Sequence, residues 1–134
     1  MAKKIVILKG SPRERGNSSV LADQVQKGAE SEGAEVASFK LNTMGIHPCC
    51  ACDACKVLED CAIPDGMAEI YPKLLEADAI VLASPIYWFT YSAQLKVCID
   101  RWYALFNQNS NAFAGKKFGI VLTYGDSDIY TSGG

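Results

Sequence analysis

Short apolar runs alternate with longer segments of mixed polarity along most of the chain. The apolar runs are rich in β-branched and aliphatic residues, as buried strands of a parallel sheet are. They predict strands at 3–11, 34–41, 78–88 and 116–125. The segments between them have apolar residues near helical spacing and predict helices at about 18–31, 67–77 and 92–107. This alternation favours an α/β fold, a doubly wound parallel sheet wrapped by right-handed crossovers.

Three loops leave the carboxyl ends of the predicted strands. They are residues 10–19, 84–92 and 123–128. Open α/β sheets bind ligands in the crevice at these ends, where the strand order reverses. We therefore expect the three loops to converge on one binding site.

The first loop, GSPRERGNSS, has the composition of an anion site. It leads into a helix, and a helix N-terminus offers unpaired N–H groups and a positive dipole end. The side chains expected to add donors are Ser11, Arg13 (or Arg15 in its place), Asn17, Ser18 and Ser19. Neither G-x-G-x-x-G nor G-x-x-x-x-G-K-[ST] occurs, which argues against the corresponding dinucleotide fold and against an NTPase. The alternative is that Asn17 or Ser18 only caps the helix and the arginines are solvated.

The second loop, SPIYWFTYS, brings four aromatic rings directly after a buried strand. Backbone N–H groups near Ile86, Tyr87 and Trp88 could bind a planar heterocycle, and an aromatic ring could stack on it or shield it. The alternative is that the rings pack in the core or at a dimer seam, which is the favoured interpretation for Phe89.

Five of the six cysteines lie within residues 47–61, HPCCACDACKVLEDC. The C-x2-C-x2-C-x5-C register consists of Cys49, Cys52, Cys55 and Cys61. Successive x2 steps are typical of the run that wraps a cubane iron–sulfur cluster, whereas structural zinc sites usually use two separated pairs. Reduced thiols without a metal, zinc and disulfides remain alternatives. Cys98 is expected to be a buried structural thiol, and Asp100 and Arg101 a structural pair.

The composition argues against two classes, nucleic-acid-binding proteins and membrane-spanning proteins. The net charge of −2 gives no basic footprint for nucleic acid, and no apolar run of about 18 residues could span a bilayer. The start of the chain reads as a strand and not as a secretory signal, because its apolar part is too short. We expect a cytoplasmic protein with reduced thiols.

The segments 10–21, 84–102 and 123–128 together resemble the flavodoxin-like NAD(P)H-dependent FMN reductases, over nearly all of residues 4–128. With residues 49–61 added, the chain is similar to the iron–sulfur flavoprotein branch of that family. A flavodoxin-like sheet has five strands, and four are evident here. The fourth would leave an apolar edge, so we expect either that a final αβ unit is missing from this chain or that a partner covers it.

The resemblance implies FMN, with its phosphate in the first loop and its ring against the second and third. The implied phosphate residues are Ser11, Arg13, Asn17, Ser18 and Ser19. The implied ring residues are Pro85, Ile86, Tyr87 and Trp88, with Thr123, Tyr124 and Gly125 closing the site. A four-iron four-sulfur cluster would be held by Cys49, Cys52, Cys55 and Cys61.

The resulting expectation is one domain, residues 1–134, with a cysteine-rich insertion at about 45–66. It would act as an FMN-dependent oxidoreductase that passes electrons from NAD(P)H or a redox carrier protein, through FMN and the cluster, to a small acceptor. No side chain is expected to act as acid or base, and a homodimer or higher homo-oligomer is expected. The alternatives are a cluster-free NAD(P)H:FMN or quinone reductase and a non-enzymatic redox-sensing thiol or metal module.

Overall fold

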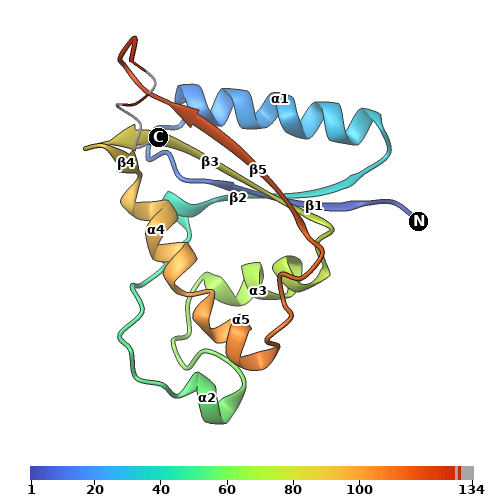
Figure 1. Ribbon diagram of the computed structural model, residues 1–134, viewed down its shortest axis with the longest axis vertical. Helices are drawn as coiled ribbons and strands as arrows, with labels where there is room; N and C mark the ends of the chain where they lie inside the picture. Colours follow the sequence, from blue (N-terminus) through green and yellow to red (C-terminus); the bar gives the residue numbers. More distant parts are fainter. Residues whose placement is uncertain (129, 131–134) are drawn as a thin grey trace.

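A computed structural model describes residues 1–128 and residue 130 of the chain; residues 129 and 131–134 of the expected domain lie outside the described part. The strands are β1 (Lys4–Lys9), β2 (Glu35–Lys40), β3 (Ala79–Tyr87), β4 (Thr90–Tyr91) and β5 (Lys117–Thr123). The helices are α1 (Asn17–Ser31), α2 (Cys55–Leu58), α3 (Met67–Glu76), α4 (Ala93–Asp100) and α5 (Tyr103–Gln108), with a 3₁₀ turn at Leu41–Thr43. Figure 1 shows α1 on one face of the sheet and α3, α4 and α5 on the other.

The sheet has the parallel order β2–β1–β3–β5, which confirms the doubly wound α/β fold. Each strand expected from the sequence is present. The additional strand, β4, is a two-residue antiparallel partner of the end of β3 that the sequence pattern did not predict. The helix expected over 92–107 is divided into α4 and α5 near Arg101 and Trp102.

Side chains of β1 alternate between the two faces of the sheet, as the period of a strand requires. Ile7 packs with Ala22 of α1, whereas Val6 and Leu8 belong to the larger core on the opposite face. That larger core is completed by buried residues of α3, α4 and α5, among them Met67, Ile70, Leu74, Leu95, Cys98 and Leu105. Two layers of helix thus bury the middle strands on both faces and fix the positions of the loops at their ends.

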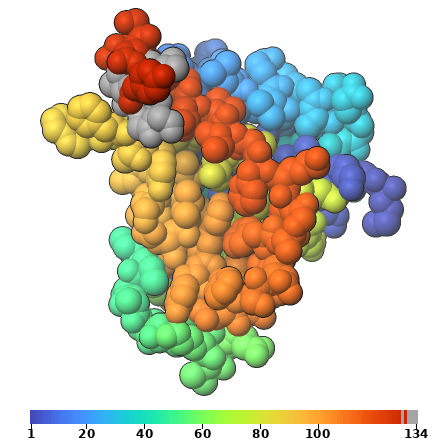
Figure 2. All heavy atoms as spheres, viewed as in Figure 1, coloured from blue at the N-terminus to red at the C-terminus, as the bar shows by residue number. Residues whose placement is uncertain are grey.

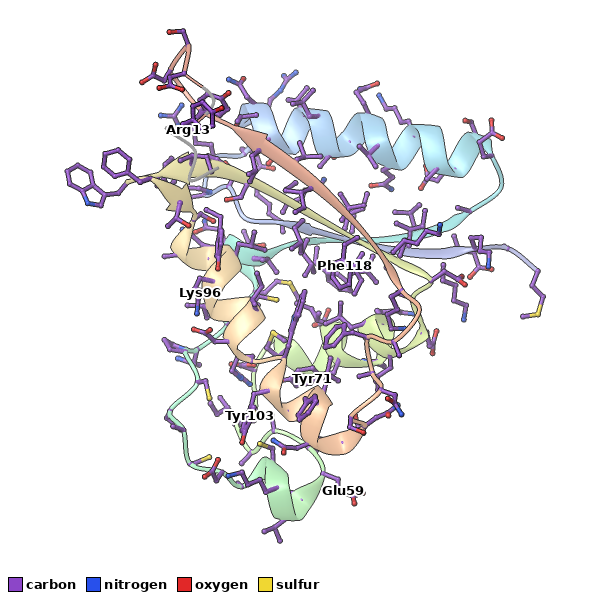
Figure 3. All side chains as sticks on the ribbon, in the orientation of Figure 1. Arg13, Glu59, Tyr71, Lys96, Tyr103 and Phe118 are labelled. Carbon is purple, nitrogen blue, oxygen red and sulfur yellow. The ribbon has the colours of Figure 1, made fainter. Side chains whose placement is uncertain are left out.

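The outer strand β5 keeps an exposed apolar face. Phe118, Ile120 and Leu122 follow one another at every second position, and all three are exposed. Trp102 and Phe113 stack with a centroid distance of 4.9 Å beside Phe118, so only the start of the strand has aromatic neighbours on this face. Figure 3 labels Phe118 on β5 between the sheet and the helices below it. The apolar edge expected from the sequence is therefore present.

No helix in the described part of the chain is long and apolar enough to span a membrane.

Candidate functional site

The first loop enters α1 without any side-chain cap. Gly16 occupies the N-cap position, and no acidic residue lies in the first turn of the helix. The first N–H groups of a helix have no partner within it, and they carry the positive end of its dipole. Since no side chain among the described residues caps them, this end of α1 can receive an anion. Figure 3 places Arg13 beside the start of α1.

Three predicted serines are buried around this helix end. Ser11, Ser18 and Ser19 are nearly inaccessible, whereas Arg13 and Asn17 are exposed. The Ser11 hydroxyl accepts a hydrogen bond of 3.2 Å from the backbone N–H of Arg13, which closes the loop on itself. Ser19 Oγ is buried with no hydrogen-bond partner among the described residues. Because buried hydroxyls are normally paired, the unpartnered Ser19 hydroxyl is a candidate donor to a bound anion.

The loop also packs closely around Gly16, so a side chain at this position would displace the Ser11 hydroxyl. A Cβ added at Gly16 would lie 2.5 Å from Ser11 Oγ, closer than real Cβ atoms come to a neighbour. The loop is therefore a tight cradle with unpaired donors, a form that fits the phosphate of a mononucleotide. The residues of the first loop therefore fit the phosphate of FMN, because they form a narrow cradle whose donors have no partner in the part of the chain that the structure describes.

Hydrogen bonds place the ends of three parallel strands side by side. The backbone N–H of Gly10 donates to the carbonyl of Ala83 over 2.7 Å. Pro85 of β3 is the register partner of Thr123 in β5. The structure thus brings the first loop, the second loop and the start of the third loop to one edge of the sheet, as expected. Tyr124 and Gly125 follow there and are exposed.

The second loop is a hairpin whose tip has an unusual backbone. Ile86 pairs with Tyr91 and Tyr87 with Thr90, so Trp88 and Phe89 form a two-residue turn. Both have positive φ, 47° and 70°, a region that bulky residues rarely adopt. Such turns normally use Asn and Gly, and strain of this kind is typical of functional loops.

The tip exposes its aromatic rings to solvent. Trp88 is 91% exposed and Phe89 62%, and the two rings meet edge to face. The alternative that Phe89 packs in the core is therefore wrong for this chain. Figure 1 shows the β3–β4 hairpin projecting beyond the helices. Tyr87 is half exposed at its base, where a flat ring could contact it.

The cysteine segment lies at the opposite end of the molecule. Figure 2 shows it in green below the orange α5, and Figure 3 labels Glu59, the residue after α2, there, far from Arg13. All six cysteines are free thiols. Five of them line one pocket together with Arg101 and Tyr103: Cys49, Cys50, Cys52, Cys55 and Cys61.

The backbone of this segment turns repeatedly through the left-handed region. Ala51, Asp53 and Glu59 all have positive φ although none is glycine. Ala51 and Asp53 flank Cys52 and direct the chain around the pocket. Such conformations cost energy and persist at sites where the surrounding structure imposes them.

The four predicted ligands share a pocket but are not closed around a centre. Within residues 1–128 and 130, no group of three or more His, Cys, Asp or Glu side chains is gathered as a metal site. Cys49 and Cys52 are exposed, Cys61 is half-buried and Cys55 is buried. The donor set, four or five thiols around one hollow, fits the chemistry of an iron–sulfur cluster, which thiolates hold.

One buried arginine organises this segment, and the sequence interpretation did not assign it there. Arg101 Nη1 lies 2.6 Å from Asp65 Oδ2, and the two side chains are 1% and 3% exposed. The same guanidinium donates to the carbonyl of His47 over 2.8 Å and to Cys61 Sγ over 3.2 Å. Asp100 instead forms a surface pair with Lys96, so the expected Asp100–Arg101 pair is wrong.

The charge of Asp65 is maintained by these partners. Burial alone would raise the pKa of the Asp65 carboxyl. Hydrogen bonds from Arg101 and from the backbone N–H groups of His47 and Met67 outweigh burial, and the pKa lies below its usual value. The sequence did carry a signal for Arg101, because it lies three residues after the buried Cys98 on the apolar side of a helix, where an arginine needs a partner.

The fold and the strand-end loops define a flavodoxin-like α/β protein. The family model for NADPH-dependent FMN reductase matches residues 3–129. The chain belongs to this family.

Several relatives of this chain are named iron–sulfur flavoproteins. An iron–sulfur flavoprotein of Methanosarcina thermophila is 38% identical over 92% of this chain and 64% of its own length. An iron–sulfur flavoprotein of Methanocaldococcus jannaschii is 39% identical over 73% of this chain and 51% of its own. The chain therefore spans about half to two thirds of the length of these relatives.

Solved structures share the fold at low identity. An NADH:FMN oxidoreductase in its apo form superposes with a TM-score of 0.69 at 20% identity, over 94% of this chain and 60% of that one. A Streptococcus mutans protein, Smu.1420, gives a TM-score of 0.73 at 22% identity, over 95% and 71%. At this identity the likeness establishes the fold alone.

Proposed function

We propose that this chain binds FMN at the ends of β1, β3 and β5 and belongs to an FMN-dependent oxidoreductase that accepts electrons from NAD(P)H or a carrier protein. The observation that carries the proposal is the orphan Ser19 hydroxyl beside the uncapped end of α1. Family membership and the names of the relatives support the same cofactor. FMN, when bound, supplies the redox chemistry by exchanging one or two electrons.

The chain's own residues would bind and orient that group. The N–H groups at the start of α1, with Ser11, Ser18 and Ser19, would hold the phosphate, and exposed Arg13 and Asn17 could add donors. The backbone following Pro85 would face one edge of the ring, and Tyr87 or Trp88 would cover its plane. Thr123, Tyr124 and Gly125 would close the other side. We assign no side chain as acid or base.

The thiol pocket is proposed to hold the second redox group, a four-iron four-sulfur cluster on Cys49, Cys52, Cys55 and Cys61. The shared pocket and the names of the relatives support it. Free thiols in every cysteine fit a reducing compartment, and we propose the cytoplasm. The exposed hairpin rings and the apolar face of β5 support self-association.

A cluster-free FMN or quinone reductase is a second candidate. The observation in its favour is that the described thiols do not converge on a centre. Iron and acid-labile sulfide analysis of anaerobically purified protein separates the two, since only the first candidate retains both elements. A redox-sensing thiol module would instead purify without flavin and change its oligomeric state when its thiols are oxidised.

Flavin titration tests the phosphate cradle directly. We expect the protein to bind FMN and to bind riboflavin, which lacks the phosphate, at least tenfold more weakly. Ser19→Ala should narrow this difference, whereas Ser110→Ala, a change at an exposed serine outside the loop, should not. Folded protein that binds neither flavin, or binds riboflavin as tightly as FMN, would contradict the proposed site.

A further inference from the structure

Two N–H donors from the α4–α5 region reach sulfur atoms of the cysteine pocket. Arg101 Nη2 lies 3.2 Å from Cys61 Sγ, and Asn107 Nδ2 lies 3.3 Å from Cys55 Sγ. Both distances are those of N–H···S hydrogen bonds. The two sulfurs belong to the two more buried members of the predicted ligand set, whereas Cys49 and Cys52 are exposed.

Both donors are held in place by contacts that do not involve sulfur. The guanidinium of Arg101 is fixed by both oxygens of Asp65, over 2.6 Å and 3.2 Å. The Asn107 amide also donates to the carbonyl of Tyr103, one turn earlier in α5, over 3.0 Å. The donors are therefore preorganised by the protein and do not need a metal group to orient them.

A donor that points at a ligand sulfur affects the reduced state more than the oxidised one. Reduction adds one electron to the thiolate-bound cluster, so the negative charge on its sulfurs rises. Hydrogen bonds to those sulfurs stabilise the added charge and raise the reduction potential. A positive donor such as Arg101 acts in the same direction and more strongly than a neutral amide.

We infer that Arg101 and Asn107 are positioning residues of the cysteine pocket, which set the reduction potential of the group that the thiols hold through hydrogen bonds to Cys61 and Cys55. The inference rests on the proposed cluster. It assigns the two helix-borne donors to a redox role that the spacing of the cysteines does not reveal. It also makes the pocket asymmetric, with donors on the inner sulfurs and solvent at the outer ones.

The test compares five proteins after anaerobic reconstitution with iron and sulfide: wild type, Asn107→Leu, Asn107→Gln, Arg101→Lys and Gln108→Leu. Each is titrated with dithionite, which donates the single electron, and the signal of the reduced cluster is followed by electron paramagnetic resonance. That signal separates the cluster from any flavin. Gln108→Leu is the matched control, because it replaces the neighbouring amide, which is exposed and forms no hydrogen bond with the sulfur of a described cysteine.

We expect Asn107→Leu to shift the reduced-to-oxidised ratio at a fixed potential by about tenfold towards the oxidised form, which is 59 mV for one electron. Asn107→Gln keeps an amide donor and should recover part of the shift, and Gln108→Leu should leave the potential unchanged. Arg101→Lys keeps the positive charge but loses the paired donors, so it should also lower the potential. If Arg101→Lys does not fold, the potentials of Asn107→Leu and Asn107→Gln, compared with that of wild type, test the inference by themselves.

An unchanged potential in Asn107→Leu, with the cluster present at wild-type content, would overturn this inference and leave the proposed cluster intact. An equal shift in Gln108→Leu would also overturn it, because the effect would then not depend on a hydrogen bond to sulfur. Wild-type protein that takes up no iron would overturn both the proposed cluster and this inference, while FMN binding would still be measured independently.

Discussion

Ser92 and Gly10 are joined by a hydrogen bond of 2.6 Å from the serine hydroxyl to the glycine carbonyl, although 82 residues separate them in sequence. Ser92 is fully buried. Its hydroxyl also caps α4 by accepting from the N–H of Leu95, and its own N–H donates to Ser84 Oγ over 2.8 Å. One residue, through its hydroxyl and its backbone N–H, therefore fixes the first loop, the end of β3 and the start of α4 relative to one another.

Ser92→Ala should weaken both the fold and the site. It removes a helix cap and leaves the Gly10 carbonyl without this partner, which together cost about 1–3 kcal/mol of unfolding free energy. FMN affinity should fall as well, because the first loop loses its attachment to α4. Urea unfolding and flavin titration measure the two effects. An equal loss in Ser110→Ala, at an exposed serine, would show that the effect is not specific to this contact.

Gly16→Ala should weaken FMN binding by tenfold or more with the helices retained. The added Cβ would meet Ser11 Oγ at 2.5 Å and open the cradle. Gly28→Ala is the matched control, because Gly28 lies in α1 with no atom near its Cβ position. That control should raise stability by about 0.5–1 kcal/mol, since alanine favours a helix more than glycine does. Unchanged affinity in Gly16→Ala would place the phosphate elsewhere.

Replacing the aromatic residues at the hairpin tip should stabilise the protein and weaken its binding of flavin. Replacing Trp88 by Asn and Phe89 by Gly supplies residues that accept positive φ, so the unfolding free energy should rise by about 1–3 kcal/mol. Flavin affinity should fall because the aromatic surface is lost. Chemical denaturation and titration of the double variant check both directions. A less stable variant would show that the turn is not strained.

Two exposed cysteines test the predicted set of ligands: Cys52 belongs to it, and Cys50 is the extra thiol outside it. Cys52→Ser should lose most of the iron retained by anaerobically purified protein, whereas Cys50→Ser should keep it. Both residues are exposed and line the same pocket, so the two variants differ mainly in register. Iron and sulfide contents give the answer. Equal losses would reject the C-x2-C-x2-C-x5-C assignment.

The Asp65–Arg101 pair should make the fold sensitive to acid. The pKa of Asp65 is lowered in the folded state, so the unfolded chain binds its proton first as the pH falls. The stabilisation is fully present above the ordinary value of about 3.9 and is lost as the pH drops from there through the lower folded value. Urea midpoints measured between neutral and strongly acidic pH follow this loss.

Asp65→Asn should remove that part of the acid dependence and destabilise the protein at neutral pH by about 3–5 kcal/mol, because it leaves the buried arginine unpaired. Asp100→Asn removes an exposed carboxylate next to Arg101 in sequence and should change the stability little. If the stability of wild type and of Asp65→Asn falls equally as the pH is lowered, other carboxylates are responsible for the loss of stability in acid.

The fold was largely predictable from the sequence because its signals are local and strong. Runs such as 78–88 are long and apolar, and alternation with helices leaves few topologies. The hairpin escaped prediction because Trp88 and Phe89 are not turn residues, and only their neighbours' pairing imposes the turn. The break between α4 and α5 likewise has no glycine or proline to announce it.

The position of the three loops of the candidate site was predictable from the sequence, whereas its long-range contacts were not. The buried serines of the first loop were assigned from composition. The roles of Ser92, Asp65 and Asn107 were missed, because each is defined by a partner 36 or more residues away. Arg101 was noticed but assigned to Asp100, the nearer carboxylate in sequence, although tertiary packing places Asp65 against it.

The central place of β3 has a consequence for how the molecule opens. This strand hydrogen-bonds to β1 on one side and to β5 on the other, and it continues into the hairpin. Its backbone N–H groups point to the two neighbours in alternation, so every second amide is protected by β1, which is itself an inner strand, and the others by the outer strand β5. β2, which has a single partner strand, can detach alone, so its amides should take up deuterium well before those amides of residues 80–84 that donate to β1.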